Sequence, residues 1–153
     1  MGWIMTVFKK LNLGCGFSRM PPVDGWVNID IDVRFNPDIV RDLSRGLPFE
    51  NGTCDKVLAS HIIEHFVPAD VIFLIQECQR VLVPGGILMI TVPLGVAPDL
   101  THESFYHEFT FDNLLVQKYN WNLSKLILIS KIFVDVPAPE NYRMMTVTFE
   151  KVK

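Results

Sequence analysis

The chain has 153 residues, of which 49% are hydrophobic and 20% are charged, and its formal net charge is −3. This length predicts a single domain, residues 1–153, that buries about two-thirds of the surface of the unfolded chain. Lysine and arginine form no cluster in the sequence, which argues against a nucleic acid partner.

The cysteine pattern indicates the cellular compartment of the protein. Cys15, Cys54 and Cys78 are scattered and show no C-x-x-C spacing. This pattern favours reduced thiols and a cytoplasmic location over a disulfide framework or a cysteine-rich zinc site.

Residues 1–9 form an apolar N-terminal segment, expected to pack on the domain or on a partner. The segment also matches the myristoylation pattern, with Gly2 as acceptor. No stretch approaches the ~20 apolar residues of a membrane-spanning helix.

The first half of the chain predicts four short strands. Nine residues, Phe17–Gly25, separate the first strand's glycine turn from the second strand, and two of them are prolines. A parallel crossover normally needs a dozen residues or more. We therefore expect the first helix to be truncated or absent. The four predicted strands cover Lys10–Leu13, Trp26–Asp30, Ile39–Arg41 and Lys56–Ser60.

The second half predicts two helices and three strands. Apolar residues at helical spacing favour a helix over Ala69–Leu82 that ends at Pro84-Gly85-Gly86. The apolar run Ile87–Val92 is typical of a central strand covered on both faces. The remaining predicted elements are a helix over Phe111–Tyr119 and an antiparallel strand pair, Leu126–Val134 and Met144–Phe149. Strands that alternate with crossovers predict an α/β, Rossmann-like fold with a mostly parallel sheet and an antiparallel C-terminal strand.

Glycines and a carboxylate follow the first two predicted strands. The sequence Leu11–Gly16 (LNLGCG) ends the first strand in a glycine turn, and Asp30 ends the second. Glycine has no Cβ, so the backbone can turn sharply and a ligand can approach closely. A carboxylate at the tip of the next strand can accept hydrogen bonds from vicinal ribose hydroxyls. The two features together predict a pocket for a nucleoside-containing cofactor.

Six segments in register resemble the class I S-adenosylmethionine-dependent methyltransferases, and most closely their short, type 11 form. They are Leu11–Gly16, Gly25–Asp30, Asp42–Leu43 with Leu47–Phe49, Cys54–Val57 with Ser60–Phe66, Arg80–Gly86, and Thr91–Pro93. The resemblance implies an enzyme of class EC 2.1.1.- that uses S-adenosylmethionine and releases S-adenosylhomocysteine. The acceptor is unidentified; a glycan, a lipid-linked intermediate or a small-molecule hydroxyl fits the resemblance.

The resemblance also implies the residues that bind the cofactor. The glycine turn would face the methionine part, Asp30 the ribose, and Asp42 the adenine. The implied set is Leu13, Gly14, Cys15, Gly16, Asp30, Ile31, Asp42, Leu43, Ser60 and His61. Two alternatives stay open: Asp32 could be the ribose partner, and Asp42 could cap the turn before Ser44.

Candidate catalytic residues are His61, His102 and His107, with Tyr106 as a further residue on the acceptor side. Methyl transfer from a sulfonium depends mainly on holding the reactants in line. A base would assist a hydroxyl acceptor by removing its proton. We expect no metal ligands in such a site.

Two other functions are compatible with the sequence. His61–His65 matches the H-x-x-E-H pattern of zinc peptidases, with Glu64 as base, which requires both histidines on one helix. The second function is that of a non-catalytic protein of the same fold, which binds the cofactor or a partner, because a fold does not fix a function. A homodimer is expected if a second subunit completes the acceptor site.

Overall fold

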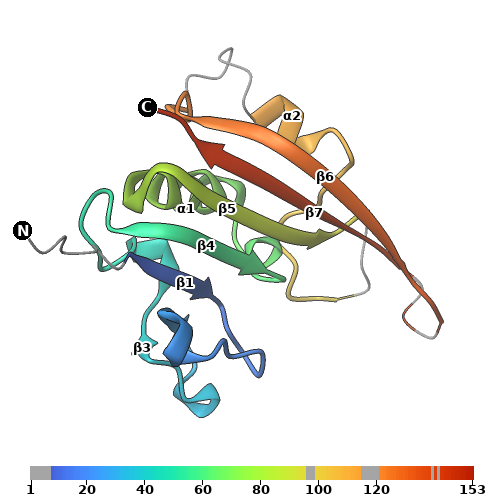
Figure 1. Cartoon of the computed structure of the whole chain (residues 1–153). Coiled ribbons are helices and arrows are strands. Elements are labelled where there is room, and N and C mark those ends of the chain that lie inside the picture. Colours follow the sequence, from blue (N-terminus) through green and yellow to red (C-terminus); the bar gives the residue numbers. More distant parts are fainter. Residues whose placement is uncertain (1–7, 96–98, 115–120, 139, 141) are drawn as a thin grey trace, which may run out of the picture.

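The computed structural model describes residues 8–95, 99–114, 121–138, 140 and 142–153. Figure 1 shows a twisted sheet with helices on one side of it. The chain order is β1 (Lys9–Leu13), β2 (Trp26–Asp30), β3 (Ile39–Val40), β4 (Cys54–Ser60), α1 (Pro68–Val81), β5 (Leu82–Pro93), α2 (Thr110–Leu114), β6 (Leu126–Val136) and β7 (Tyr142–Lys151).

The seven strands form one sheet in the order β3-β2-β1-β4-β5-β7-β6. The first five strands pair in parallel, whereas β7 is antiparallel to both β5 and β6. The predicted α/β fold, with a mostly parallel sheet and an antiparallel C-terminal strand, is therefore confirmed. Because β1 to β4 are parallel, their carboxyl ends meet at one edge, where ligands of such sheets bind.

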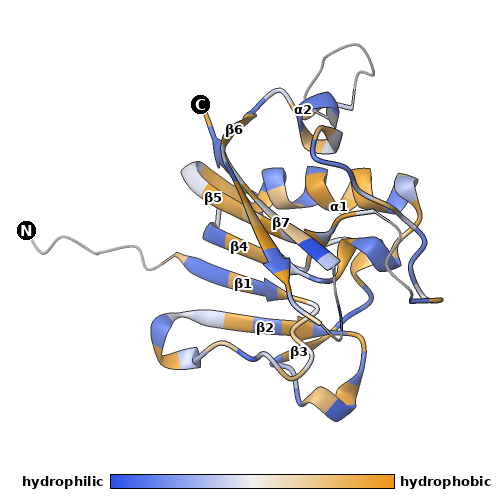
Figure 2. Cartoon of the chain, turned by 90° about the vertical axis from the view of Figure 1, so that its right-hand side faces the viewer, coloured by the Kyte–Doolittle hydropathy of each residue, from blue (hydrophilic) through white to orange (hydrophobic). Residues whose placement is uncertain are grey.

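The first helix is reduced to a single 3-10 turn, as the short connection predicts. This turn, Pro22–Asp24, follows Pro21 and ends at Gly25, whose φ is 80°. The connections on either side of β3 likewise hold only 3-10 turns, Val33–Phe35 and Leu43–Arg45. Among the described residues, the two α-helices lie on the same side of the sheet (Figures 1 and 2).

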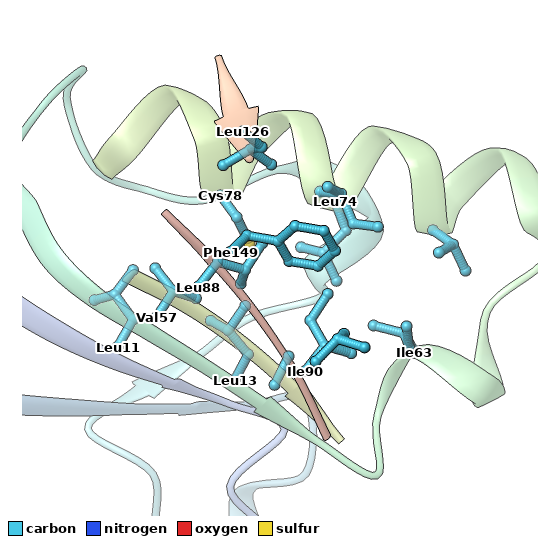
Figure 3. Packing of buried hydrophobic residues seen from close by; sticks show 14 of the residues in the cluster. Leu11, Leu13, Val57, Ile63, Leu74, Cys78, Leu88, Ile90, Leu126 and Phe149 are labelled. Atoms are coloured by element: carbon cyan, nitrogen blue, oxygen red, sulfur yellow. The ribbon is translucent and has the colours of Figure 1, made fainter. Parts of the chain in front are cut away.

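The hydrophobic core lies between α1 and the sheet (Figure 3). Alternate strand residues point toward the helix, as the two-residue period of a strand requires. Fully buried side chains include Leu11, Val57, Leu88, Val147 and Phe149. The helix contributes Val71, Leu74, Ile75, Cys78 and Val81. Burying each large side chain stabilises the fold by roughly 1.5–3 kcal/mol relative to its exposure.

The opposite face of β5 carries side chains that are only partly buried, so the expectation of a strand covered on both faces is wrong. Within Ile87–Val92, Leu88, Ile90 and Val92 are buried, but the alternate residues are only partly buried. The reason is the loss of helices from the early connections. On the same face, Ile132 is 58% exposed and Val134 is 47% exposed on β6.

Some boundaries differ from the sequence prediction. The first helix ends at Val81 and β5 begins at the next residue, so Pro84-Gly85-Gly86 forms an irregularity within the strand rather than a separate turn. The second helix is described over Thr110–Leu114, and the rest of its predicted range lies outside the described residues. Gly2 and most of the N-terminal segment also lie outside them. No described helix is long and apolar enough to cross a membrane.

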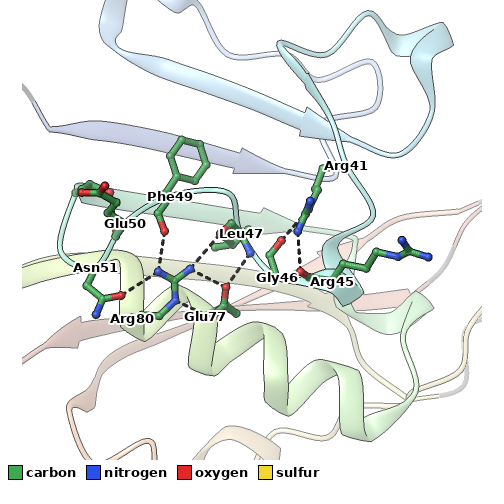
Figure 4. A network of polar contacts seen from close by, with 10 residues as sticks. Arg41, Arg45, Gly46, Leu47, Phe49, Glu50, Asn51, Glu77 and Arg80 are labelled. Carbon is green, nitrogen blue, oxygen red and sulfur yellow. Dashed lines mark hydrogen bonds and ion pairs between the residues drawn. The ribbon is translucent and has the colours of Figure 1, made fainter.

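A polar network fastens the loop before β4 to α1 (Figure 4). The Arg80 guanidinium donates to the carbonyls of Leu47 and Phe49 at 3.0 and 2.7 Å. It also donates to both carboxylate oxygens of Glu77 at 2.7 Å. Glu77 in turn accepts the N–H of Leu47 at 2.8 Å. The Arg80 hydrogen bonds, aided by the Leu47 N–H, hold the pKa of the Glu77 carboxyl below its ordinary value.

Replacing Glu77 by glutamine is expected to reduce stability at neutral pH by about 2 kcal/mol, since hydrogen bonds to charged groups contribute about 1.5–3 kcal/mol. Because the folded pKa is depressed, the Glu77 contribution is complete above the ordinary pKa of 4.5 and is lost as the pH falls through the folded pKa. Urea unfolding at pH 7 and at successively lower pH checks this. The difference in the free energy of unfolding between wild type and Glu77→Gln should become smaller toward low pH. A difference that does not change with pH would contradict the prediction.

Candidate functional site

A cavity of about 370 Å³ borders the glycine turn after β1. Residues at the end of β4 also line it. Of the residues predicted to bind a cofactor, five line it, and they are Gly14, Cys15, Gly16, Ser60 and His61. Its other lining residues are Asn12, Phe17, Ser18, Met20 and Leu58. The sequence motif that follows β1 therefore surrounds a cavity together with the motif that follows β4.

The two glycines of the turn have different surroundings. Gly14 has a φ of 61°, and a Cβ built on it would lie 2.5 Å from Cδ1 of Ile62. Gly16 has a φ of 47°, and nothing would lie within 4 Å of its Cβ. Gly14 therefore gives room to a neighbouring side chain, whereas Gly16 borders open space. Cys15 between them is buried, and burial raises the pKa of its thiol.

Asp30 lies against the glycine turn. Its carboxylate accepts the N–H of Gly16 at 2.8 Å and the N–H of Asp32 at 2.9 Å. The residue is 7% exposed. The tips of β1 and β2 thus meet directly, which the sequence predicted from the adjacency of the strands. A carboxylate can accept about four hydrogen bonds, so two positions remain for another donor.

Asp30 and the other predicted cofactor-binding residues, Leu13, Ile31, Asp42 and Leu43, are not among the residues that line this cavity. The Asp42 carboxylate accepts the hydroxyl and the N–H of Ser44 at 2.7 and 3.0 Å, which is the capping role left open from the sequence. These bonds lower the pKa of Asp42. Leu43 is buried, and Leu13 is fully buried behind the turn.

Apolar side chains stand exposed beyond the ends of β1 and β2. Phe17 is 93% exposed, Ile31 67% and Val33 69%. The ring of Phe17 contacts that of Phe35 edge-on, with 4.7 Å between centroids. Exposed apolar groups gathered at the carboxyl ends of strands often mark a ligand site. Of the three, the sequence prediction included only Ile31.

His61 occupies a strained backbone position at the end of β4. Its φ of 52° lies in the left-handed region, which costs a residue with a Cβ about 1 kcal/mol or more. Its N–H donates to the Thr91 carbonyl at 2.9 Å. The ring lies between two side chains: Nδ1 is 3.3 Å from Oε1 of Glu64, and Nε2 is 3.2 Å from Sδ of Met144.

A second cavity, of about 310 Å³, lies on the other side of His61. Its lining joins the residues after β4 to those after β5 and to the start of β7. The lining residues are His61, Glu64, His65, Pro93, Asp99, His102, Glu140 and Tyr142. His61 is therefore shared by both cavities. The sequence predicts His61 and His102 as site residues but not Tyr142. Tyr142 reaches this cavity because of the antiparallel register between β5 and β7.

Two other candidates from the same loop lie elsewhere. Tyr106 is buried in the core, where its hydroxyl donates to the Ile63 carbonyl at 3.1 Å and its ring stacks on Phe111. Burial raises its pKa, so the phenol stays protonated. His107 is exposed and lines neither cavity.

The H-x-x-E-H segment does not form one α-helix. His61, the first residue of the segment, has a left-handed conformation, and only Ile63–His65 forms a short 3-10 turn. The arrangement that the zinc peptidase pattern requires, two histidines one turn apart on a helix, is absent from residues 61–65.

Comparison with known proteins agrees with this geometry. Residues 27–90 match the family model described as a methyltransferase domain. No curated protein sequence matches the chain. Three solved structures are similar to it over most of their length, and each is a methyltransferase.

The N-methyltransferase NodS from Bradyrhizobium japonicum WM9 superposes with a TM-score of 0.72 at 13% identity, covering 97% of this chain and 88% of its own. A methyltransferase from Archaeoglobus fulgidus that depends on S-adenosylmethionine (SAM) gives 0.67 at 14% identity, with coverages of 94% and 86%. The Burkholderia thailandensis 1,6-didemethyltoxoflavin-N1-methyltransferase, which contains S-adenosylhomocysteine, gives 0.68 at 16% identity, with coverages of 95% and 72%.

The strand order, the strand-end motifs, the family match and these superpositions agree with one another. They confirm the resemblance found in the sequence: the chain has the fold of the class I S-adenosylmethionine-dependent methyltransferases.

Proposed function

We propose that the chain transfers a methyl group from S-adenosylmethionine to an acceptor hydroxyl, such as that of a glycan, a lipid-linked intermediate or a small molecule. The position of His61 carries the proposal, because its side chain borders both cavities. A donor at the glycine turn and an acceptor in the second cavity would meet beside this residue. The family match and the bound S-adenosylhomocysteine of two similar structures support the choice of cofactor.

The residues around the glycine turn fit this cofactor. The open space beside Gly16 admits a ligand, and the carboxylate of Asp30 retains free acceptor positions near it. The exposed side chains of Phe17, Ile31 and Val33 offer an apolar surface for the adenine. S-Adenosylmethionine would supply a methyl group already activated on a sulfonium, leaving S-adenosylhomocysteine.

His61 is the proposed general base. With the proton on Nδ1 facing the Glu64 carboxylate, Nε2 carries the lone pair that can accept a proton from the acceptor hydroxyl once that hydroxyl takes the place of Met144 Sδ, which lies 3.2 Å from Nε2. A carboxylate that orients a histidine in this way fixes both its tautomer and its direction. His102 lines the acceptor cavity and is proposed to contact the acceptor, whereas His107 has no such support.

Isothermal titration calorimetry with S-adenosylhomocysteine is expected to show one site of micromolar affinity on the wild-type chain. His61→Gln should lower methyl incorporation from labelled S-adenosylmethionine into a cell extract by about 10²-fold or more, far more than it lowers that affinity, although His61 also lines the donor cavity. An absence of binding at millimolar S-adenosylhomocysteine would refute the proposal. Binding without any transfer in the wild type would favour the non-catalytic alternative.

Two finer points belong to the same proposal. A cytoplasmic location is supported by the three cysteines, which are free and buried. A homodimer is supported by the exposed apolar residues of β6, which a second copy could cover, and it stays a prediction.

A further inference from the structure

Glu64, His65 and His102 converge in the second cavity. One potential ligand atom from each lies within 4.8 Å of the other two. Glu64 and His65 belong to the 3-10 turn after β4, whereas His102 comes from the loop after β5. The fold thus brings together a carboxylate and two imidazoles from segments that are far apart in the sequence.

Glu64 is buried with one oxygen unpaired. The residue is 1% exposed, and its Oε2 has no hydrogen-bond partner among the described residues. Its Oε1 is occupied by Nδ1 of His61 at 3.3 Å. A buried polar atom without a partner costs about 1–3 kcal/mol, and more when it is charged. A cation beside Oε2 would remove this cost.

The two histidines are held toward the same point. Nδ1 of His65 lies 3.0 Å from the Thr101 hydroxyl and 3.3 Å from its carbonyl, and within the part of the chain that the structure describes Nε2 makes no hydrogen bond. The ring of His102 packs edge-on against that of His65, with 4.9 Å between centroids, and its side chain is 8% exposed. Metal-binding histidines are usually oriented by a contact to their other ring nitrogen, and the Thr101 contacts to Nδ1 of His65 are of this kind. For His102 the contact is between Nε2 and Oδ2 of Asp99, at 3.7 Å.

The loop that carries His102 is fastened to the turn that carries Glu64. The N–H groups of Glu103 and Ser104 both donate to the Glu64 carbonyl, at 2.8 and 3.0 Å. The Ser104 hydroxyl donates to the Phe66 carbonyl at 2.6 Å. Together with the Tyr106 hydroxyl on Ile63, these bonds fix the distance between the two segments. The cluster is therefore built into the fold.

We propose that Glu64, His65 and His102 bind a divalent first-row transition metal ion, of which Zn²⁺ is the representative. Two imidazoles with a carboxylate suit such ions better than they suit Mg²⁺ or Ca²⁺. Ligand atoms around tetrahedral zinc lie about 3.3 Å apart, so separations of up to 4.8 Å need to close by up to about 1.5 Å. The exposed ring of His65 can make most of that movement. This set replaces His61 of the sequence pattern by His102 and departs from the expectation of no metal ligands.

Three protein ligands leave coordination positions open toward the cavity. An acceptor hydroxyl bound there would have a lower pKa, which would ease the loss of its proton to His61. This role of the ion rests on the proposed function, whereas the binding of the ion does not.

Metal-free protein without an affinity tag is titrated with Zn²⁺ by calorimetry and with Co²⁺ by visible absorption, in the absence of S-adenosylhomocysteine. One ion per chain is expected. His65→Ala and Glu64→Gln should each lower the affinity by at least about tenfold, because each removes a ligand. His107→Ala is the matched control: an exposed histidine of the same loop, whose loss should leave the affinity unchanged.

Absence of one-to-one binding, or an equal loss in His107→Ala and His65→Ala, would overturn the inference. Since His65 is exposed, His65→Ala keeps the test decisive if Glu64→Gln does not fold. A separate titration with S-adenosylhomocysteine distinguishes the two proposals. If the chain binds S-adenosylhomocysteine but no metal, the proposed function stands and the metal site is refuted. If it binds only metal, the metal site stands and the proposed function is refuted.

Discussion

Gly14→Ala is expected to lower the free energy of unfolding by about 3 kcal/mol. A left-handed conformation costs a residue with a Cβ about 1–2 kcal/mol. The added methyl would also lie 2.5, 2.6 and 2.9 Å from three atoms of the Ile62 side chain, and overpacking of this kind typically costs 1–3 kcal/mol. Because Cβ of Ile62 is one of these atoms, rotation of the side chain cannot relieve the overlap. Urea unfolding followed by circular dichroism measures the loss.

Gly16→Ala is the matched control for this prediction. It has a similar backbone conformation but nothing within 4 Å of the added methyl, so its loss should be about 1 kcal/mol. Adding Ile62→Ala to Gly14→Ala should recover part of the cost as a coupling energy between the two positions. Equal losses at the two glycines, with no coupling to Ile62, would show that the conformation alone accounts for both.

The sequence predicted the architecture because the local signals agreed with one another. The first two apolar runs ended at glycine and at an acidic residue, and the nine-residue connection Phe17–Gly25, with its two prolines, was too short for a full crossover helix. The prediction failed where a signal depended on distant partners. The run Ile87–Val92 looks covered on both faces because all its residues except Thr91 are apolar. Its actual exposure depends on helices that the early connections are too short to supply.

The site was predicted only in part, for the same reason. The glycine turn, Ser60 and His61 could be placed together, since strand ends meet at one edge of a parallel sheet. Tyr106 has the composition of a binding-loop residue, yet the hydrogen bond of its hydroxyl to Ile63 places it in the core. The proximity of His102 to Glu64 depends on backbone hydrogen bonds between two loops, which leave no pattern in the residue types.

Asp30→Asn is expected to weaken the binding of S-adenosylhomocysteine by tenfold or more, if Asp30 accepts the ribose hydroxyls. A hydrogen bond to a charged group contributes about 1.5–3 kcal/mol, and each 1.4 kcal/mol is a factor of ten in affinity. The orientation of the carboxylate is already fixed by the N–H groups of Gly16 and Asp32. Its free acceptor positions would therefore be held in place before the ligand arrives, so little entropy is lost on binding.

Asp32→Asn separates this interpretation from its alternative. The Asp32 carboxylate is partly buried and already paired with Arg34, whose side-chain hydrogen bonds lower the pKa of Asp32. Binding a ribose there would require giving up that pair, so Asp32→Asn should leave the affinity within about twofold of wild type by the same free-energy scale. Calorimetry on both variants, below the unfolding temperature of each, decides the matter. A loss confined to Asp32→Asn would move the ribose site to Asp32, which lies two residues beyond the end of β2 at Asp30.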